Sequence, residues 1–292
     1  MSPESPTVLV IGDAMLDVSA LPDGPVRDGQ DVPAQIRLQP GGQGANVAVR
    51  LARRGVATRL VCGIGDDAAG RILADALHDE SVDVDPIRVP ATGIVVVALG
   101  AGGERTMLSQ RQPLGARLAA RAIPEAAWTV LSGYVLLESD EASTIRRFAA
   151  LRTIRVLAGC TVPDGARASW RAAAIGVRAD LLIVNRDEAE WLDPVAGLAP
   201  VVVTTAADAV SATFADGAIH VAPRVRPDAI DTTGAGDAFV ATLVAQLSQA
   251  AWPPSRAFLE PALAVAAEHA GEVATVSGAQ TRVPLEAGAA GR

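Results

Sequence analysis

Short apolar runs alternate with amphipathic stretches along most of the chain. The apolar runs are rich in Val, Ile and Leu and have the length of buried strands; they lie at residues 8–11, 59–62, 130–136, 156–158, 181–184 and 201–204. Patterns with helical periodicity lie between them, at residues 45–54, 68–77, 141–151 and 186–192. This alternation predicts an α/β fold: a doubly wound, mainly parallel central sheet with helices on both faces. Ligands of such a sheet bind beside the carboxyl ends of its strands.

Two stretches depart from the alternation. Residues 31–38 alternate polar and apolar side chains, which is typical of a strand with one covered face. Residues 92–99 and 104–110 resemble the strands of a hairpin whose turn is the glycine-rich segment 100–103. No helical pattern is available to cover these strands. They therefore form either a small antiparallel β sheet of their own or an extension of the main sheet's edge.

Composition narrows the class of protein. The chain has 292 residues, of which 50% are hydrophobic, enough to bury a large core. Composition alone is equally compatible with two domains and with one α/β domain that has a small appendage, and we expect a single domain over residues 1–292. Its formal net charge of −8 leaves no basic stripe for nucleic acid. No apolar run reaches the roughly 18 residues of a membrane span, and the N-terminus lacks the pattern of a signal peptide. Cys62 and Cys160 lie in apolar contexts typical of reduced thiols, so we expect a cytoplasmic protein.

The strongest candidate for chemistry is the segment 231–237, Asp-Thr-Thr-Gly-Ala-Gly-Asp, which runs directly into an apolar helical pattern. Small residues let backbone amides at a helix N-terminus surround an anion, and the helix dipole adds positive charge there. Asp237 stands in the first turn, where a carboxylate can take a proton from an alcohol during phosphoryl transfer. The alternative is a structural turn capped by an acid. The two acids of the segment, Asp231 and Asp237, favour a ligand site, because buried carboxylates need compensating partners.

A second glycine cluster, Gly-Gly-Gln-Gly-Ala-Asn at residues 41–46, opens another helical pattern. Together with Gly-Asp-Ala-Met-Leu-Asp at residues 12–17, it resembles the ribokinase-like (PfkB) family of sugar and nucleoside kinases. The family motifs Gly-Gly-x-x-x-Asn and Asp-Thr-x-Gly-Ala-Gly-Asp match in order, and residues 185–188 match the motif Asn-x-x-Glu. The resemblance spans residues 6–284.

The resemblance implies an ATP-dependent phosphotransferase that phosphorylates a primary hydroxyl of a small polyol or sugar. Asp237 would act as general base, and the amides of Gly234, Ala235 and Gly236 would stabilise the transferring phosphoryl group. The two irregular stretches become a small lid inserted into the domain, approximately residues 13–40 and 92–111.

The resemblance also implies the remaining site residues. The acceptor sugar would bind Asp17, Gly42, Asn46 and Glu138, and the nucleotide would bind Asn185, Thr205, Ala206 and Gly236. Mg²⁺ would bind through water to Asn185 and Glu188, and a monovalent cation such as K⁺ would bind near Asp231, Thr233 and Gly278.

Some of these residues have other interpretations. Glu138 at a strand end is equally compatible with solvation, and Asn185 with Glu188 is compatible with a helix cap plus a solvent-facing Glu. Arg105 and Arg111, in the second lid segment, would face either an anionic acceptor or solvent.

The sequence departs from the family at two places. The family's Gly-x-x-Gly nucleotide turn is replaced by alanines at Ala206 and Ala209, and Gln43 stands where ribokinases proper have Lys. The alternatives are therefore a nucleoside kinase of the same fold and a catalytically weak sugar-binding or regulatory protein. The lid lacks aromatic residues, which disfavours stacking of a base.

The lid is apolar on one face, at Val32, Ala34, Ile36 and Leu38, and again at residues 94–97. Exposed apolar strands associate unless they are covered. We therefore expect a homodimer that pairs its lids, with a monomer as the alternative.

Overall fold

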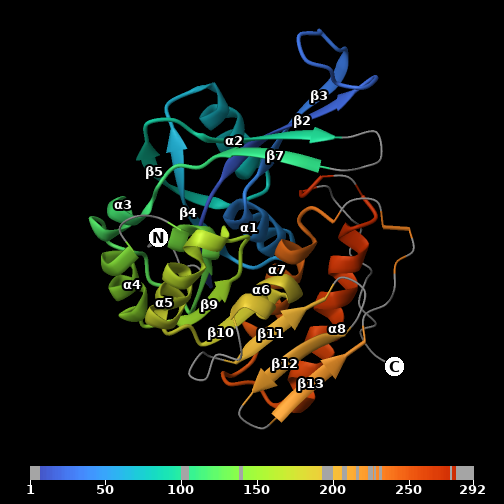
Figure 1. Cartoon of the computed structure of the whole chain (residues 1–292). Coiled ribbons are helices and arrows are strands. Elements are labelled where there is room, and N and C mark those ends of the chain that lie inside the picture. Colours follow the sequence, from blue (N-terminus) through green and yellow to red (C-terminus); the bar gives the residue numbers. More distant parts are fainter. Residues whose placement is uncertain are drawn as a thin grey trace.

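The computed structural model describes residues 7–99, 105–137, 141–192, 200–205, 209–214, 217–222, 226, 228–229, 232–276 and 278–280. Within them, nine strands form one sheet in the order β13-β12-β11-β10-β9-β8-β1-β4-β5 (Figure 1). The strands are β1 (Val8–Ile11), β4 (Thr58–Gly65), β5 (Asp83–Val89), β8 (Trp128–Ser132), β9 (Ile154–Ala158), β10 (Leu181–Asn185), β11 (Val201–Thr204), β12 (Val210–Phe214) and β13 (Gly217–Val221). Neighbouring strands are parallel except in the β11–β12 and β12–β13 pairs. The prediction of a mainly parallel α/β sheet is confirmed.

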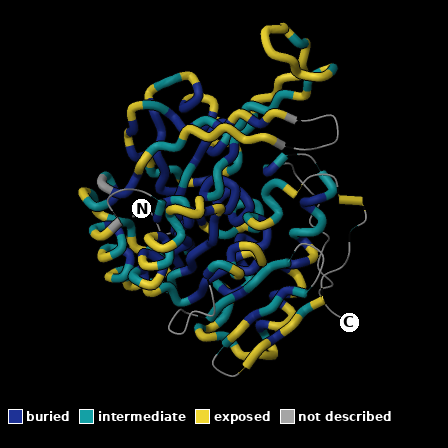
Figure 2. Tube along the Cα trace, viewed as in Figure 1, coloured by how far each residue is buried: buried dark blue, intermediate teal, exposed yellow. Residues whose placement is uncertain are grey.

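Helices cover both faces of this sheet. They are α1 (Gln43–Arg53), α2 (Ala68–Asp79), α3 (Gly115–Ala119), α4 (Glu141–Ala149), α5 (Arg167–Val177), α6 (Arg186–Leu192), α7 (Ala235–Leu247) and α8 (Arg256–Val273). Successive residues of a strand point to opposite faces. Accordingly, Val8 and Val10 of β1 pack in the core that contains α1, α7 and α8, while Leu9 and Ile11 pack in the core that contains α4 and α5. Figure 2 shows this buried interior running through the centre of the molecule.

The secondary structure after β8 differs from the sequence prediction. A strand was expected over residues 130–136, but β8 ends at Ser132 and a 3₁₀ helix, η1 (Gly133–Leu137), follows. Trp170 Nε1 donates a hydrogen bond to the Gly133 carbonyl at 2.9 Å, and a side chain at Gly133 would meet the Ala158 carbonyl at 2.6 Å. The tight approach of β9 and α5 therefore turns the chain at the end of the strand.

A second sheet of four strands lies over the carboxyl end of the first, at the top of Figure 1. Its order is β3-β2-β6-β7, with β2 (Met15–Pro22), β3 (Ala34–Gly41), β6 (Gly93–Leu99) and β7 (Arg105–Gln110). The β2–β3 and β6–β7 pairs are antiparallel, and a parallel pairing of β2 with β6 joins the two. The turn expected at residues 100–103 lies outside the described residues.

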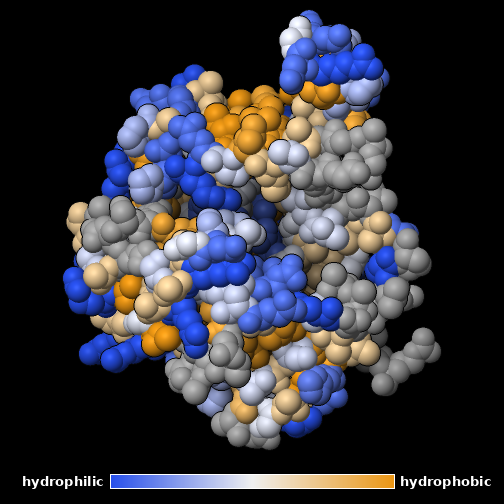
Figure 3. All heavy atoms as spheres, in the orientation of Figure 1, coloured by the Kyte–Doolittle hydropathy of each residue, from blue (hydrophilic) through white to orange (hydrophobic). Residues whose placement is uncertain are grey.

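The two faces of the four-stranded sheet differ. Directly opposed residues share a face, and Leu38, Val18, Val96 and Leu108 are opposed in one row across all four strands. We call these four residues the outer row; Leu38 is 53% exposed and Leu108 is 66% exposed. Figure 3 shows apolar surface beneath the polar tip of the β2–β3 hairpin. The opposite face turns toward the main sheet.

Candidate active site

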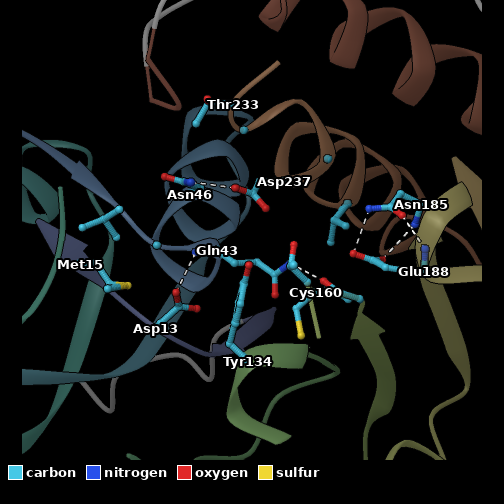
Figure 4. Close-up of a pocket in the computed structure, with 18 of the residues that line it drawn as sticks. Asp13, Met15, Gln43, Asn46, Tyr134, Cys160, Asn185, Glu188, Thr233 and Asp237 are labelled. Atoms are coloured by element: carbon cyan, nitrogen blue, oxygen red, sulfur yellow. Dashed lines mark hydrogen bonds between the residues drawn. The ribbon is translucent and has the colours of Figure 1, made fainter. Parts of the chain in front are cut away.

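A pocket of about 460 Å³ lies between the two sheets. Its walls come from the carboxyl ends of β1, β8, β9, β10 and β11, the amino-terminal ends of α1 and α7, and the inner face of the four-stranded sheet (Figure 4). The predicted site residues that line it are Asp17, Gly42, Asn46, Asn185, Glu188, Thr233, Gly234, Gly236 and Asp237. Segments that are far apart in the sequence therefore meet at one cavity, at the edge of the sheet where the α/β pattern predicts it.

Asp237 lies in the first turn of α7 and is hydrogen-bonded within the pocket. Asn46 Nδ2 donates to Asp237 Oδ2 at 2.7 Å (Figure 4). The pKa of Asp237 is raised to about 7, chiefly by burial and also by the nearby charges of Asp13 and Asp17, while the Asn46 hydrogen bond and the Arg50 charge oppose the rise. A carboxylate with this pKa can accept a proton near neutral pH, which suits a general base.

The turn before Asp237 is built on Gly234, whose φ of 77° is left-handed and favours glycine. The Ala235 amide donates to the Thr232 carbonyl at 3.2 Å, and Ala235 does not line the pocket, whereas Gly234 and Gly236 do. Of the three residues predicted for the anion hole, Ala235 is therefore turned away, because its amide closes the turn. The positive end of the α7 dipole still faces the cavity.

Asp17 enters the pocket from β2. Its pKa is raised to about 6, chiefly by burial and also by the charge of Asp13, while the charge of Arg111 opposes the rise. Its Oδ1 atom is buried without a hydrogen-bond partner within the described residues. A side chain on Gly41 would lie 2.2 Å from Asp17 Oδ2, so the glycine makes room for the carboxylate. An unpartnered carboxylate oxygen in a pocket is a natural acceptor for a ligand hydroxyl.

The Asn46 side chain makes hydrogen bonds within the protein that its predicted role in sugar binding does not require. Besides donating to Asp237, it accepts a hydrogen bond from Gln280 Nε2 at its Oδ1 atom, at 2.9 Å. One donor hydrogen and one lone pair of the amide remain. The side chain therefore orients Asp237 and retains one donor for a ligand.

An ion pair that the sequence did not predict lies beside Asp17. Arg111 Nη1 contacts Asp13 Oδ2 at 2.5 Å, and the guanidinium lies 3.6 Å from the centroid of the Tyr134 ring. Both Arg111 and Asp13 line the pocket, so the expectation that Arg111 faces the site is supported, although its charge is already paired. The missed signal was the position of Asp13, which directly follows the first strand as site residues of α/β sheets do.

Gln43, which stands where ribokinases have Lys, joins three strand ends. Its Nε2 donates to the Gly159 carbonyl at 2.7 Å, and its Oε1 accepts from Ser132 Oγ at 2.7 Å and from the Gly133 amide at 3.2 Å. Ser132 Oγ also lies 3.1 Å from Asp13 Oδ1. Gln43 thus fixes the pocket floor.

Asn185 and Glu188 form a reciprocal helix cap at the start of α6. The Glu188 amide donates to Asn185 Oδ1 at 2.8 Å, and the Asn185 amide and side chain donate to the two oxygens of Glu188 at 3.0 and 2.9 Å. The helix-cap interpretation is therefore correct, but Glu188 does not face solvent: it is 8% exposed and lines the pocket. Burial raises its pKa.

The remaining predicted site residues are of two kinds: those outside the described residues and those that do not line the pocket. Glu138, Ala206 and Asp231 lie outside the described residues. Thr205 donates its hydroxyl to the Ala209 carbonyl at 2.8 Å, and the neighbouring Thr204 lines the pocket instead. Gly278 also does not line it. Across the described part of the chain, no three His, Cys, Asp or Glu residues are grouped as a metal site, and no helix there combines the length and apolarity needed to cross a bilayer.

Known proteins resemble this chain in both sequence and fold. Residues 5–286 match the model of the pfkB family carbohydrate kinases. A fructokinase from Klebsiella pneumoniae is 33% identical and covers 96% of each chain. A ribokinase structure from Thermotoga maritima has a TM-score of 0.77 at 20% identity, covering 96% of each chain. An aminoimidazole riboside kinase from Salmonella enterica, complexed with aminoimidazole riboside and an ATP analogue, has a TM-score of 0.75 at 24% identity and covers 95% of this chain and 96% of its own.

These matches extend over nearly the whole chain, and they confirm both the ribokinase-like fold and the prediction of an ATP-dependent sugar kinase. The chain belongs to the pfkB family of carbohydrate kinases.

Proposed function

We propose that this kinase transfers the γ-phosphoryl group of ATP to a primary hydroxyl of a small sugar, with fructose as the first acceptor to test. One observation carries the proposal: Asp237 lies at the amino-terminal end of α7 with a pKa raised to about 7, in the same pocket as Asp17. A base and an anion-binding helix end therefore share a cavity with a hydroxyl-binding carboxylate.

Each residue of the pocket named below has its own role in the proposed reaction. Asp17 Oδ1 accepts a hydroxyl of the sugar and orients its primary alcohol toward Asp237. Asp237, held by Asn46, removes the alcohol proton as the oxygen attacks the γ-phosphorus; the bond from the γ-phosphorus to the β–γ bridging oxygen breaks, and ADP leaves. The Gly234–Gly236 turn and the α7 dipole stabilise the negative charge of the phosphoryl group in flight. Closure of the cavity by the lid excludes water that would otherwise compete with the sugar.

Asn185 and Glu188 fit a magnesium ion held through water. Each oxygen of Glu188 accepts one hydrogen bond from Asn185 and keeps a lone pair, and Mg²⁺ retains several waters with few direct protein ligands. When bound, the ion neutralises charge on the nucleotide phosphates. We also propose that K⁺ binds near Asp231, Thr233 and Gly278.

A nucleoside acceptor is the second candidate, and the similarity to an aminoimidazole riboside kinase favours it. Tyr134 is the one aromatic residue among the described residues that line the pocket. Arg111 already covers one face of its ring, which leaves at most the other face for stacking on a base. The pocket therefore favours a sugar. The intact pairing of Asn46 with Asp237 also argues against a catalytically weak protein.

The outer row supports a homodimer. Leu38, Val96 and Leu108 are exposed apolar side chains on one face, and we propose that a second copy covers them. Cys62 and Cys160 are free and buried, which suits the cytoplasm that we propose as its location.

An ADP-release assay over pentoses, hexoses, sugar acids and nucleosides, with ATP and Mg²⁺, tests the function. We expect turnover with a hexose or pentose and its loss in excess chelator. Preference for a nucleoside would favour the second candidate. Absence of turnover with every acceptor would contradict the proposal, and full activity in chelator would exclude the role of magnesium.

A further inference from the structure

Arg50 is a buried cation that the reaction scheme above does not use. It lies on α1 one helical turn after Asn46, is 3% exposed, and does not line the pocket. Its Nε atom is buried without a hydrogen-bond partner within the described residues. A buried charge with an unpaired donor lowers the stability of the fold. Arg50 is therefore a candidate for a functional role.

Arg50 and Asn46 together hold the segment 278–280. Arg50 Nη2 donates to the Ala279 carbonyl, and Asn46 Oδ1 accepts from Gln280 Nε2 at 2.9 Å. Residues four apart lie on one face of a helix. One face of α1 therefore makes hydrogen bonds with two successive residues of this segment. Asn46 also donates a hydrogen bond to Asp237.

The carbonyl that Arg50 holds packs against the turn that begins α7. A side chain on Gly234 would lie 2.8 Å from the Ala279 oxygen, so the segment and the glycine turn are in close contact. Because residues 278–280 and the Gly234 turn are packed this closely, a shift of residues 278–280 would displace the turn that begins α7.

The charge of Arg50 also reaches the general base. Burial lowers the pKa of Arg50 to about 10 and the charge of Asp237 raises it, so the guanidinium remains positive at neutral pH. In return Arg50 lowers the pKa of Asp237, which Asp13 and Asp17 raise. The other charges around the guanidinium are Arg53 and Arg54, which are like charges, and from α8 His269, whose pKa Arg50 lowers. Charges buried in a medium of low dielectric constant interact strongly.

We propose that Arg50 is a positioning residue for phosphoryl transfer: its guanidinium clamps the Ala279 carbonyl against the Gly234 turn and provides a fixed positive charge behind Asp237. The proposal rests on the kinase function above. It assigns to α1 a resident cation at the amino-terminal end of α7, on the side away from the pocket.

Arg50→Met tests this role, because Met removes the charge and keeps much of the volume. We expect kcat to fall about tenfold or more with little change in the KM for either substrate. The acid limb of kcat/KM should move to higher pH by roughly one unit, since Asp237 loses an opposing charge. Arg50→Lys should retain more activity than Arg50→Met.

Arg54→Met is the matched control. Arg54 is also a desolvated arginine at the end of α1, but its opposite charge is Glu272 and not Asp237. We expect its pH profile to stay that of the wild type. In Arg50→Ala, added guanidinium ion should restore part of kcat, which a role in packing alone does not predict.

Hydrogen exchange provides a measurement that does not depend on activity. In Arg50→Met, exchange should speed up in the peptide that contains residues 278–280 before other parts of the chain. Wild-type protein without kinase activity would contradict the proposed function, whereas unchanged exchange would contradict the clamp. A folded Arg50→Met with wild-type kcat and pH profile would overturn the proposal, as would an inactive one with neither a pH shift nor rescue by guanidinium. An Arg50→Lys that is folded but as impaired as Arg50→Met would also count against it.

Discussion

The two walls of the cleft differ in how far their polar groups are already paired. On the wall formed by α1, α7 and residues 278–280, which we call the catalytic wall, Asp237, Asn46 and Gln280 form one chain of hydrogen bonds. On the wall formed by β2, β3, β6 and β7, which we call the acceptor wall, Asp17 Oδ1 is buried without a partner among the described residues. On the outer row of the same wall, Leu38, Val96 and Leu108 are exposed to solvent.

This difference indicates which wall of the cleft is already paired within the protein and which wall is left to bind another molecule. Hydrogen bonds already made in the free protein need not be formed during the reaction, so the catalytic wall is preorganised for the transition state. The acceptor wall leaves a carboxylate without a partner and an apolar face uncovered, and we propose a different occupant for each: the sugar on the inner face and a second copy on the outer face. Changes in the catalytic wall should therefore affect kcat, and changes in the acceptor wall should affect KM and assembly.

The largest effect is expected from Asp237→Asn, which removes the proposed base of the catalytic wall. We expect kcat to fall on the order of 10²- to 10⁴-fold, because an amide cannot take the alcohol proton. In the wild type, kcat/KM should fall below a pH of about 7, the value to which burial raises the pKa of Asp237. Steady-state kinetics across pH measure both.

The same substitution should not weaken the fold. A folded-state pKa raised from 3.8 to about 7 means that ionised Asp237 reduces stability as pH rises through that interval. At pH 8 the free energy of unfolding of Asp237→Asn should equal or exceed that of the wild type, as measured by urea denaturation. Asp75→Asn, at an exposed carboxylate of α2, is the control. Near-normal turnover by a stable Asp237→Asn would exclude Asp237 as the base.

Asp17→Asn should have a smaller effect and a different one. Loss of a charged hydrogen-bond acceptor costs roughly 10- to 100-fold in affinity, so the KM for the sugar should rise by about that factor. The KM for ATP should stay close to that of the wild type. The control is Asp23→Asn, just beyond β2 on an exposed part of the chain. A fall in kcat with an unchanged sugar KM would show that the two walls are not separable in this way.

Val96→Asp tests the outer row. A charge in the centre of a covered apolar face disfavours its burial, so we expect a dimer to dissociate and the KM for the sugar to rise severalfold. Light scattering measures the mass, and Val26→Asp, at a 74% exposed position between β2 and β3, is the control. A wild-type monomer, or a dimer that Val96→Asp leaves intact, would remove the outer row from the interface.

On both walls, the sequence predicted residues that stand in local motifs but not the contacts between distant segments. Asp17, Asn46 and Asp237 stand in motifs that can be read from local order along the chain, and all three line the pocket. The contacts of Arg111 with Asp13 and of Arg50 with Ala279 join residues 98 and 229 positions apart, and no local pattern encodes such pairs. Among the strands, β5 was missed because it contains Pro86 directly after Asp85. A proline is tolerated there because β5 lies at the edge of the sheet.

The smallest effect is expected from potassium. The resemblance to ribokinases predicts a monovalent cation near Asp231, Thr233 and Gly278, and Arg50 already provides a positive charge beside Ala279. Because the resident charge supplies part of what a bound cation would supply, rates in potassium salts should exceed those in sodium salts by only about twofold. The same comparison in Arg50→Met should give a larger ratio, since only the exchangeable cation is then left. Equal rates in both salts for both proteins would exclude a cation site, and a strong dependence of the wild type on potassium would mean that Arg50 supplies little of the charge at the catalytic wall.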